Sequence, residues 1–115
     1  MFGIKEIDSQ ELAQRLNDDS GTLRLVDVRT PGEVNQGVIP GARSTPLHLL
    51  PLKADELSDD ADIIFYCRTG ARSAQACAFL ASRGHTRVWN LRGGIVDWAR
   101  RGLPVRPPAD EALAG

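Results

Sequence analysis

The sequence Ile-Ile-Phe-Tyr-Cys-Arg-Thr-Gly-Ala-Arg-Ser at residues 63–73 sets the architecture of the chain. Its first four residues are apolar and have a strong β preference, so they predict a buried strand over Ile63–Tyr66. A helix is predicted from about Ala71 to Arg83, and Gly84 ends it. A buried strand that leads through a short loop into a helix is the repeating unit of a parallel α/β sheet.

The segments on either side continue this alternation of strands and helices. Asp8 and Glu11 are spaced as a capping box and predict the start of a helix. The alternation predicts an α/β domain with a mainly parallel sheet and helices on both faces. The further strands are predicted at residues 4–7, 23–28, just after 42 and 87–90, and the further helices after residue 8, near 33–36, broken over 47–57, and from 94 to about 101.

The length of 115 residues suits one domain, which we expect over residues 1–104, followed by a loosely held tail over 105–115. No apolar run approaches the roughly 18 residues of a membrane span, so no membrane partner is expected. The first residues lack a secretory pattern, and the expected compartment is the cytoplasm. A monomeric core is compatible with this length.

The net charge of -1 excludes a strongly basic domain, so no nucleic-acid partner is expected. It conceals an asymmetry: residues 1–62 carry a balance of -6, and residues 63–106 carry +7. Twelve of the fourteen cations are arginines, whose forked guanidinium suits anions. Most of them are expected on the solvated surface, but Arg68 and Arg72 flank a cysteine.

That cysteine, Cys67, directly follows the predicted buried strand. Ligands of open parallel sheets bind beyond the carboxyl ends of the strands. A turn at Gly70 would point backbone N–H groups toward an anion, and the N-terminus of the following helix would add its partial positive charge. The anion would be either the Cys67 thiolate or a substrate. Arg68 and Arg72 would add positive charge, and Ser73 is expected to cap the helix. The sequence therefore predicts a reactive cysteine in an anion-binding loop.

The second cysteine, Cys77, is expected to be a core residue. It shares a helical stripe with three alanines, which favours packing against the sheet over a role as a resolving cysteine. The alanines are Ala74, Ala78 and Ala81. Two cysteines, with two histidines far from both in sequence, are too few for a zinc site, so neither a metal nor a cofactor is expected.

Three segments of the chain resemble the signatures of the rhodanese-like sulfurtransferases. Cys67–Ser73, CRTGARS, is similar to the active-site loop of that family. Val26–Ala42, VDVRTPGEVNQGVIPGA, resembles its N-terminal signature, and Asn90–Arg100, NLRGGIVDWAR, its C-terminal one. The resemblance covers about residues 4 to 104. It implies a five-stranded parallel sheet flanked by helices and a cysteine that carries sulfur as a persulfide.

The resemblance also implies roles for individual residues. Cys67 falls on the catalytic position. Asp27 and Arg29 fall on a DxR pair that orders the site, for which a structural ion pair is favoured over direct chemistry. The loop positions whose amides would cradle the persulfide or the incoming anion are Arg68, Thr69, Gly70, Ala71 and Arg72.

One position departs from the family pattern. The family commonly reads Gly-His-Ile-Pro-Gly-Ala where this chain has Val38 in place of the histidine. Valine neither titrates nor donates a hydrogen bond through its side chain, so a local packing change is expected there. The C-terminal signature is kept at Gly93, Gly94 and Trp98. The two glycines are expected to form a tight turn from strand to helix, and the Trp98 indole is expected to pack on the sheet.

The expected function is the transfer of a sulfane sulfur from thiosulfate or a persulfide to cyanide or a thiol, through a Cys67 persulfide and with ping-pong kinetics. The expected partners are a small anionic donor and a thiol or dithiol protein acceptor. A non-catalytic binding module of the same family is one alternative. A cysteine phosphatase or arsenate reductase is another, but such enzymes typically place five residues between cysteine and arginine, and this chain has four.

Overall fold

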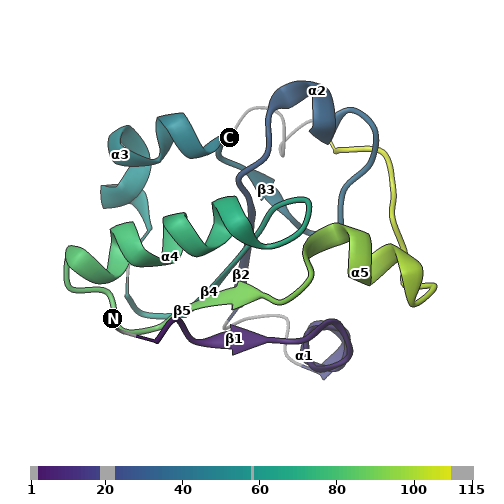
Figure 1. Cartoon of the computed structure of the whole chain (residues 1–115), viewed down its shortest axis with the longest axis horizontal. Coiled ribbons are helices and arrows are strands. Elements are labelled where there is room, and N and C mark those ends of the chain that lie inside the picture. The colour runs from purple at the N-terminus through teal and green to yellow at the C-terminus, as the bar shows by residue number, and fades with distance from the viewer. Residues whose placement is uncertain (1–2, 19–22, 58, 110–115) are drawn as a thin grey trace.

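The computed structural model describes residues 3–18, 23–57 and 59–109. Within them, five strands form one parallel sheet in the order β1-β5-β4-β2-β3 (Figure 1). This confirms the predicted α/β class and the five-stranded parallel sheet. The strands are β1 Glu6–Ile7, β2 Leu23–Asp27, β3 Arg43–Ser44, β4 Asp62–Tyr66 and β5 Val88–Leu91.

The central strand β4 is buried on both faces, as its unbroken apolar sequence predicts. Ile63 and Phe65 belong to one core cluster, while Ile64 and Tyr66 belong to the other. Because successive side chains of a strand point to opposite faces, β4 supplies both cores of the domain. Its carboxyl end is thereby fixed at the centre of the molecule, and Cys67 follows there.

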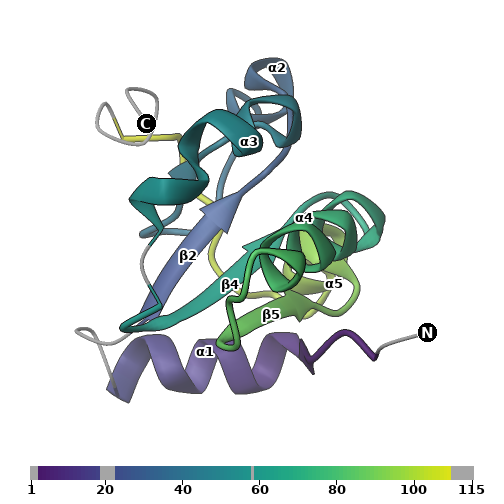
Figure 2. The same cartoon turned by 90° about the vertical axis from the view of Figure 1, so that its left-hand side faces the viewer.

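Helices cover both faces of the sheet, and Figure 2 shows α1 below the strands with α3 and α4 above them. The helices α1 (Ser9–Asp18) and α5 (Gly94–Arg100) contribute buried residues to one core. The helices α3 (Leu50–Lys53) and α4 (Ala71–Ser82) contribute to the other. Short helix α2 (Pro31–Val34) follows β2. No helix of the described residues is long and apolar enough to cross a membrane.

Two helical predictions can be compared with the structure in detail. The capping box of α1 is present, because the Glu11 N–H donates to Asp8 Oδ1 at 2.8 Å and the Asp8 N–H to Glu11 Oε1 at 3.1 Å. The expected break over 47–57 is also confirmed, since α3 is flanked by 3₁₀ turns at 47–49 and 54–56. Pro46 precedes the first turn and Pro51 lies in the first turn of α3, where proline is tolerated.

The predicted alanine stripe of α4 was wrong for two of its members, because Ala78 and Ala81 are exposed. The buried side of α4 is instead Ser73, Ala76, Cys77 and Leu80. Cys77 itself is 1% exposed and lies in the core, as predicted. The helix is rotated because the larger Leu80 takes the inward position that the stripe assigned to alanine.

The expected loose tail requires correction at its start. Val38 and Arg106 form an antiparallel bridge, with N···O distances of 2.8 and 2.9 Å. The Trp98 indole N–H donates to the carbonyl of Pro104 at 2.8 Å, which holds the chain just before the bridge. These contacts fix the first residues of the tail, while residues 110–115 lie outside the described part of the chain. The buried Val38 thus joins the end of the domain through its backbone.

The charge asymmetry of the sequence is partly neutralised by ion pairs between the two halves of the chain. Four arginines of the second half pair with acids of the first half across the domain. These ion pairs are Arg72–Glu33, Arg83–Asp55, Arg87–Asp62 and Arg92–Glu6. These four ion pairs neutralise half of the eight arginines in residues 63–106.

Candidate active site

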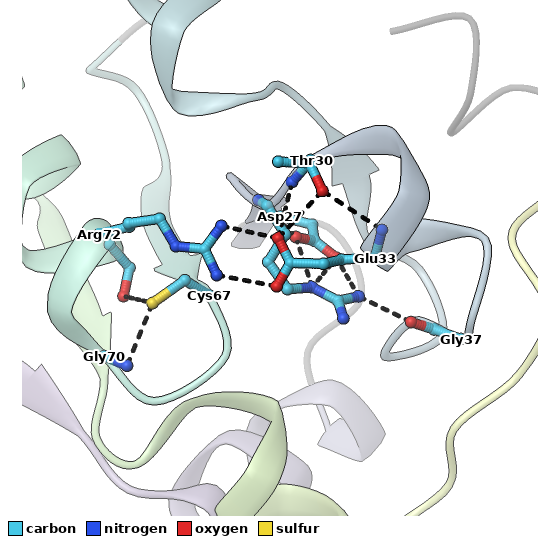
Figure 3. A network of polar contacts seen from close by, with 9 residues as sticks. Asp27, Thr30, Glu33, Gly37, Cys67, Gly70 and Arg72 are labelled. Carbon is cyan, nitrogen blue, oxygen red and sulfur yellow. Dashed lines mark hydrogen bonds and ion pairs between the residues drawn. The ribbon is translucent and has the colours of Figure 1, made fainter.

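Cys67 lies at the carboxyl end of β4, at the start of a short loop that leads into α4 (Figure 3). The loop turns at Gly70, whose φ of +113° is a conformation that favours glycine. This turn brings the Gly70 N–H to 3.1 Å from Cys67 Sγ. Tyr66 before the loop and Ala76 after it are both fully buried, so the loop is held at both ends.

The environment of Cys67 favours its thiolate. The residue is only 1% exposed, and this burial alone would raise the pKa of the thiol. The hydroxyl of Ser73 and the backbone N–H groups of Ser73, Gly70 and Thr69 act in the opposite direction and bring the pKa below its ordinary value. The loop is thus a nest of hydrogen-bond donors around the sulfur.

Ser73 does not cap α4, and that prediction was wrong. The N-cap position is Gly70, and Ser73 lies in the first turn with its side chain fully buried. Its hydroxyl contacts Cys67 Sγ at 3.4 Å and Asn90 Oδ1 at 2.5 Å. Asn90, on β5, was not singled out as a site residue, and a single polar residue in a strand gives no signal of such a role.

Arg72 faces the site, but its guanidinium is already paired. It forms a two-point ion pair with Glu33 of α2, with N···O distances of 2.7 and 2.9 Å (Figure 3). The hydrogen bond from Arg72 is the main reason that the pKa of Glu33 falls to about 2. Arg68 and Ala71 of the loop are exposed. Sequence reasoning missed Glu33, although Thr30 and Glu33 have capping-box spacing and the structure contains that box.

The predicted pair of Asp27 and Arg29 is a buried ion pair. The Arg29 guanidinium donates to both carboxylate oxygens of Asp27, and the shortest distance is 2.7 Å. It also donates to the carbonyl of Gly37 at 2.7 Å, and the side chain lies over the ring of Tyr66. The pair ties the segment after β2 to the end of β4 and has no contact with the sulfur among the described hydrogen bonds, which supports the structural interpretation.

The N-terminus of α5 fixes the cysteine loop from the other side. The N–H of Ile95 donates to the carbonyl of Cys67 at 3.0 Å, and the N–H of Val96 to that of Arg68 at 3.1 Å. Gly94, with φ +60°, lies against these carbonyls, and a Cβ there would collide with the backbone of Cys67 and Arg68. The Gly93-Gly94 pair therefore allows α5 to approach the loop and hold it.

This contact predicts a large cost for Gly94→Ala. The methyl group would push α5 away from the loop, and we expect the free energy of unfolding to fall by about 3 kcal/mol or more, with loss of Cys67 reactivity. Gly102→Ala is the matched control, because Gly102 has φ +79° but open space around its Cβ position. Its cost is expected to be only about 1 kcal/mol, from backbone conformation alone. Urea unfolding measures both, and equal losses would show that the close approach to the loop does not matter.

The described residues contain no group of three or more histidine, cysteine, aspartate or glutamate side chains that could hold a metal ion. The groups that the structure places around Cys67 are the chain's own. They are one thiol, its ring of N–H and O–H donors, and a nearby arginine–glutamate pair.

Comparisons with known proteins agree with this architecture. A family model described as the Rhodanese-like domain matches residues 8–101. A sulfurtransferase of Allochromatium vinosum is 54% identical over 105 residues, which cover 91% of this chain and 97% of the relative. The crystal structure of a rhodanese-like domain protein from Staphylococcus aureus has a TM-score of 0.81 at 28% identity, covering 92% of this chain and 100% of that one. A rhodanese-related protein from Thermoplasma volcanium has a TM-score of 0.80 at 29% identity and covers 89% and 97%.

Proposed function

The chain belongs to the rhodanese-like domain family, and we propose that it is a sulfurtransferase in which Cys67 carries the transferred sulfur as a persulfide. One observation carries the proposal: the Cys67 sulfur lies inside a loop whose N–H groups and Ser73 hydroxyl favour its thiolate. The thiolate is the nucleophilic form of cysteine. The similarity to a protein named sulfurtransferase supports the same reaction class.

The proposed reaction consists of two displacements at sulfur. The Cys67 thiolate attacks the outer sulfur of thiosulfate, the S–S bond of the donor breaks, and sulfite leaves with the bonding electron pair. The enzyme then holds the sulfur as a Cys67 persulfide. Cyanide or a thiolate attacks that outer sulfur, the Cys67–sulfur bond breaks, and the thiolate is regenerated. Such a covalent intermediate gives ping-pong kinetics.

The loop suits this chemistry because negative charge leaves Cys67 Sγ in the first step and returns to it in the second. Fixed N–H donors in a site of low polarity stabilise such charge without reorganisation. Neither step requires the site to transfer a proton to a carbon or oxygen leaving group. The lack of a nearby histidine among the donors to Cys67 Sγ is therefore consistent with sulfur transfer.

The near-complete burial of Cys67 bears on the choice of donor. A donor must bring an atom to a sulfur that is only 1% exposed. Thiosulfate and persulfides both present a single terminal sulfur atom at the end of the molecule. This shape favours thiosulfate and persulfides over a bulkier electrophile such as an aryl phosphate. It therefore also favours sulfur transfer over the phosphatase alternative.

Arg72 is expected to favour anionic donors. It interacts electrostatically with Cys67 as well as with Glu33. In Arg72→Ala we expect kcat/KM for thiosulfate to fall roughly tenfold more than for a persulfide with an uncharged head group, because the dianion loses the larger attraction. Arg83→Ala, which removes an exposed ion pair with Asp55 from the far end of α4, is the control. Equal losses for the two donors would mean that Arg72 only shapes the loop.

A donor screen tests the proposed function. Thiosulfate, glutathione persulfide and mercaptopyruvate are compared at equal concentration with cyanide as acceptor, and thiocyanate is measured. Turnover with thiosulfate or the persulfide is expected. Absence of turnover with every donor, in a folded protein with a free Cys67 thiol, would favour a non-catalytic binding module. Cys67-dependent hydrolysis of a small aryl phosphate would favour the phosphatase instead.

A further inference from the structure

The side chain of Asn90 closes a chain of hydrogen bonds that begins at the Cys67 sulfur. Ser73 Oγ lies 3.4 Å from Cys67 Sγ and 2.5 Å from Asn90 Oδ1. Asn90 is 3% exposed and Ser73 is fully buried, so both contacts are shielded from bulk solvent. Cys67 directly follows β4, Ser73 lies in α4 and Asn90 in β5, and the packing of these elements fixes their relative positions.

The orientation of the Asn90 amide follows from its other partners. Its Nδ2 donates to the carbonyl of Gly70 at 3.2 Å and to Glu6 Oε2 at 3.3 Å. Both partners are acceptors, so the NH₂ group must face them and the amide oxygen must face Ser73. In this orientation Asn90 Oδ1 can only accept a hydrogen bond from the Ser73 hydroxyl.

A hydroxyl has one proton, and this sets up a competition. While Cys67 is a thiol, Ser73 donates to Asn90 Oδ1, and the thiol can donate to the lone pairs of Ser73 Oγ. When the thiol proton leaves to solvent, the thiolate becomes an acceptor only. The Ser73 proton must then turn from Asn90 to sulfur, and Asn90 Oδ1 loses its donor.

We propose that Asn90 is a positioning residue that restrains the Ser73 hydroxyl and thereby opposes formation of the Cys67 thiolate. This restraint keeps the Cys67 thiol protonated up to a higher pH. The backbone N–H donors of the loop act in the opposite direction and favour the thiolate. The inference rests on the proposed function only in that sulfur transfer uses the Cys67 thiolate as its nucleophile. The proton competition itself is independent of any sulfur donor.

Six charged side chains lie around the hydrogen-bond chain. They come from β1, the segment after β2, α2, the cysteine loop and α4. They are Glu6, Asp27, Arg29, Glu33, Arg68 and Arg72. All six remain in every variant, but Asn90→Leu removes the hydrogen bond that Glu6 accepts from Asn90, so the effect of that loss must be separated from the effect on Ser73.

The test is a cycle of four proteins: the parent, Asn90→Leu, Ser73→Ala and the double variant. The pH midpoint of iodoacetamide alkylation is measured on the tryptic peptide that contains Cys67, with circular dichroism to establish folding. Ser73→Ala should move the midpoint to higher pH, because a donor to the thiolate is lost. Asn90→Leu should move it to lower pH and raise the alkylation rate below the midpoint roughly twofold or more, because Ser73 is free to turn.

The double variant separates the proton competition from loop shaping. Asn90→Leu also removes the hydrogen bonds to Gly70 and Glu6, and any effect of those losses persists without Ser73. We therefore expect Asn90→Leu to shift the midpoint only when Ser73 is present. A shift of the same size in both backgrounds, or a shift to higher pH in Asn90→Leu, would overturn the inference. If Asn90→Leu does not fold, Asn90→Ala serves in its place. Sulfur loading from thiosulfate is not used, so failure here is distinct from failure of the proposed function.

Discussion

Cys67→Ser is expected to lower sulfur transfer by at least about a thousandfold, because it removes the thiolate that is the nucleophile of the first displacement and the leaving group of the second. The serine hydroxyl does not ionise near neutral pH, and the donors of the loop cannot make it a comparable nucleophile. The change is small in volume at a position with little free space, so the fold should persist. Turnover of thiosulfate and cyanide to thiocyanate measures the loss.

Cys77→Ala is the matched control for this result. Cys77 is buried to the same extent as Cys67, but burial, together with nearby Glu6, raises the pKa of its thiol to about 12. It therefore stays protonated and unreactive at neutral pH. The control should keep nearly full turnover and lose about 1 kcal/mol of stability through the small cavity. Retained turnover in Cys67→Ser, or its loss in Cys77→Ala, would show that Cys67 is not the cysteine that carries the chemistry.

Asp27→Ala is expected to cause the largest loss of stability, about 3–5 kcal/mol, because it leaves the buried Arg29 guanidinium without its carboxylate. Asp27 is 1% exposed and Arg29 is 5% exposed, so water cannot replace the lost partner without rearrangement. The segment that Arg29 holds through Gly37 should loosen as well. Urea unfolding of the variant and the parent measures the difference.

Two further variants make this prediction specific. Asp55→Ala breaks the exposed pair with Arg83 and should cost less than about 1 kcal/mol. The double change Asp27→Ala with Arg29→Met removes both buried charges and should recover part of the loss. If the double variant is as unstable as Asp27→Ala, the cost lies in packing or in the Gly37 contact and not in the uncompensated charge.

Much of the fold follows from local sequence patterns. The buried strand at 63–66 has an apolar run bounded by turn residues, and the helix after it begins where Gly70 permits the turn. The capping box at Asp8 and Glu11 marks the start of α1. These signals are contained within a few residues, so they are readable without knowledge of distant contacts.

The features that sequence reasoning missed depend on residues far apart in the chain. Glu33 meets Arg72 across 39 positions, and Asn90 meets Ser73 across 17. Neither pairing has a local pattern, because it is created when α2 and β5 pack beside α4. Serine favours the N-cap position of helices, and this preference alone predicts Ser73 as a cap. In the structure its side chain is buried and donates to Asn90 Oδ1 on β5 instead. The tail was expected to be loose because no local pattern shows the bridge from Arg106 to Val38.

The charge pattern shows the same limit. An arginine-rich second half suggested positive charge around the cysteine, yet four of those arginines pair with acids of the first half. What favours the thiolate is instead a set of backbone N–H groups and one hydroxyl. Sequence located the loop, and the folded geometry identified its donors.

The most direct test of the account is the mass of Cys67 after treatment with thiosulfate. Trypsin places Cys67 in the peptide of residues 54–68 and Cys77 in that of residues 73–83, so the two thiols are read separately. A persulfide carried by Cys67 predicts one added sulfur on the 54–68 peptide, removal of that sulfur by cyanide, and no addition on the 73–83 peptide. An unchanged 54–68 peptide after both thiosulfate and glutathione persulfide, or sulfur found on Cys77, would contradict it.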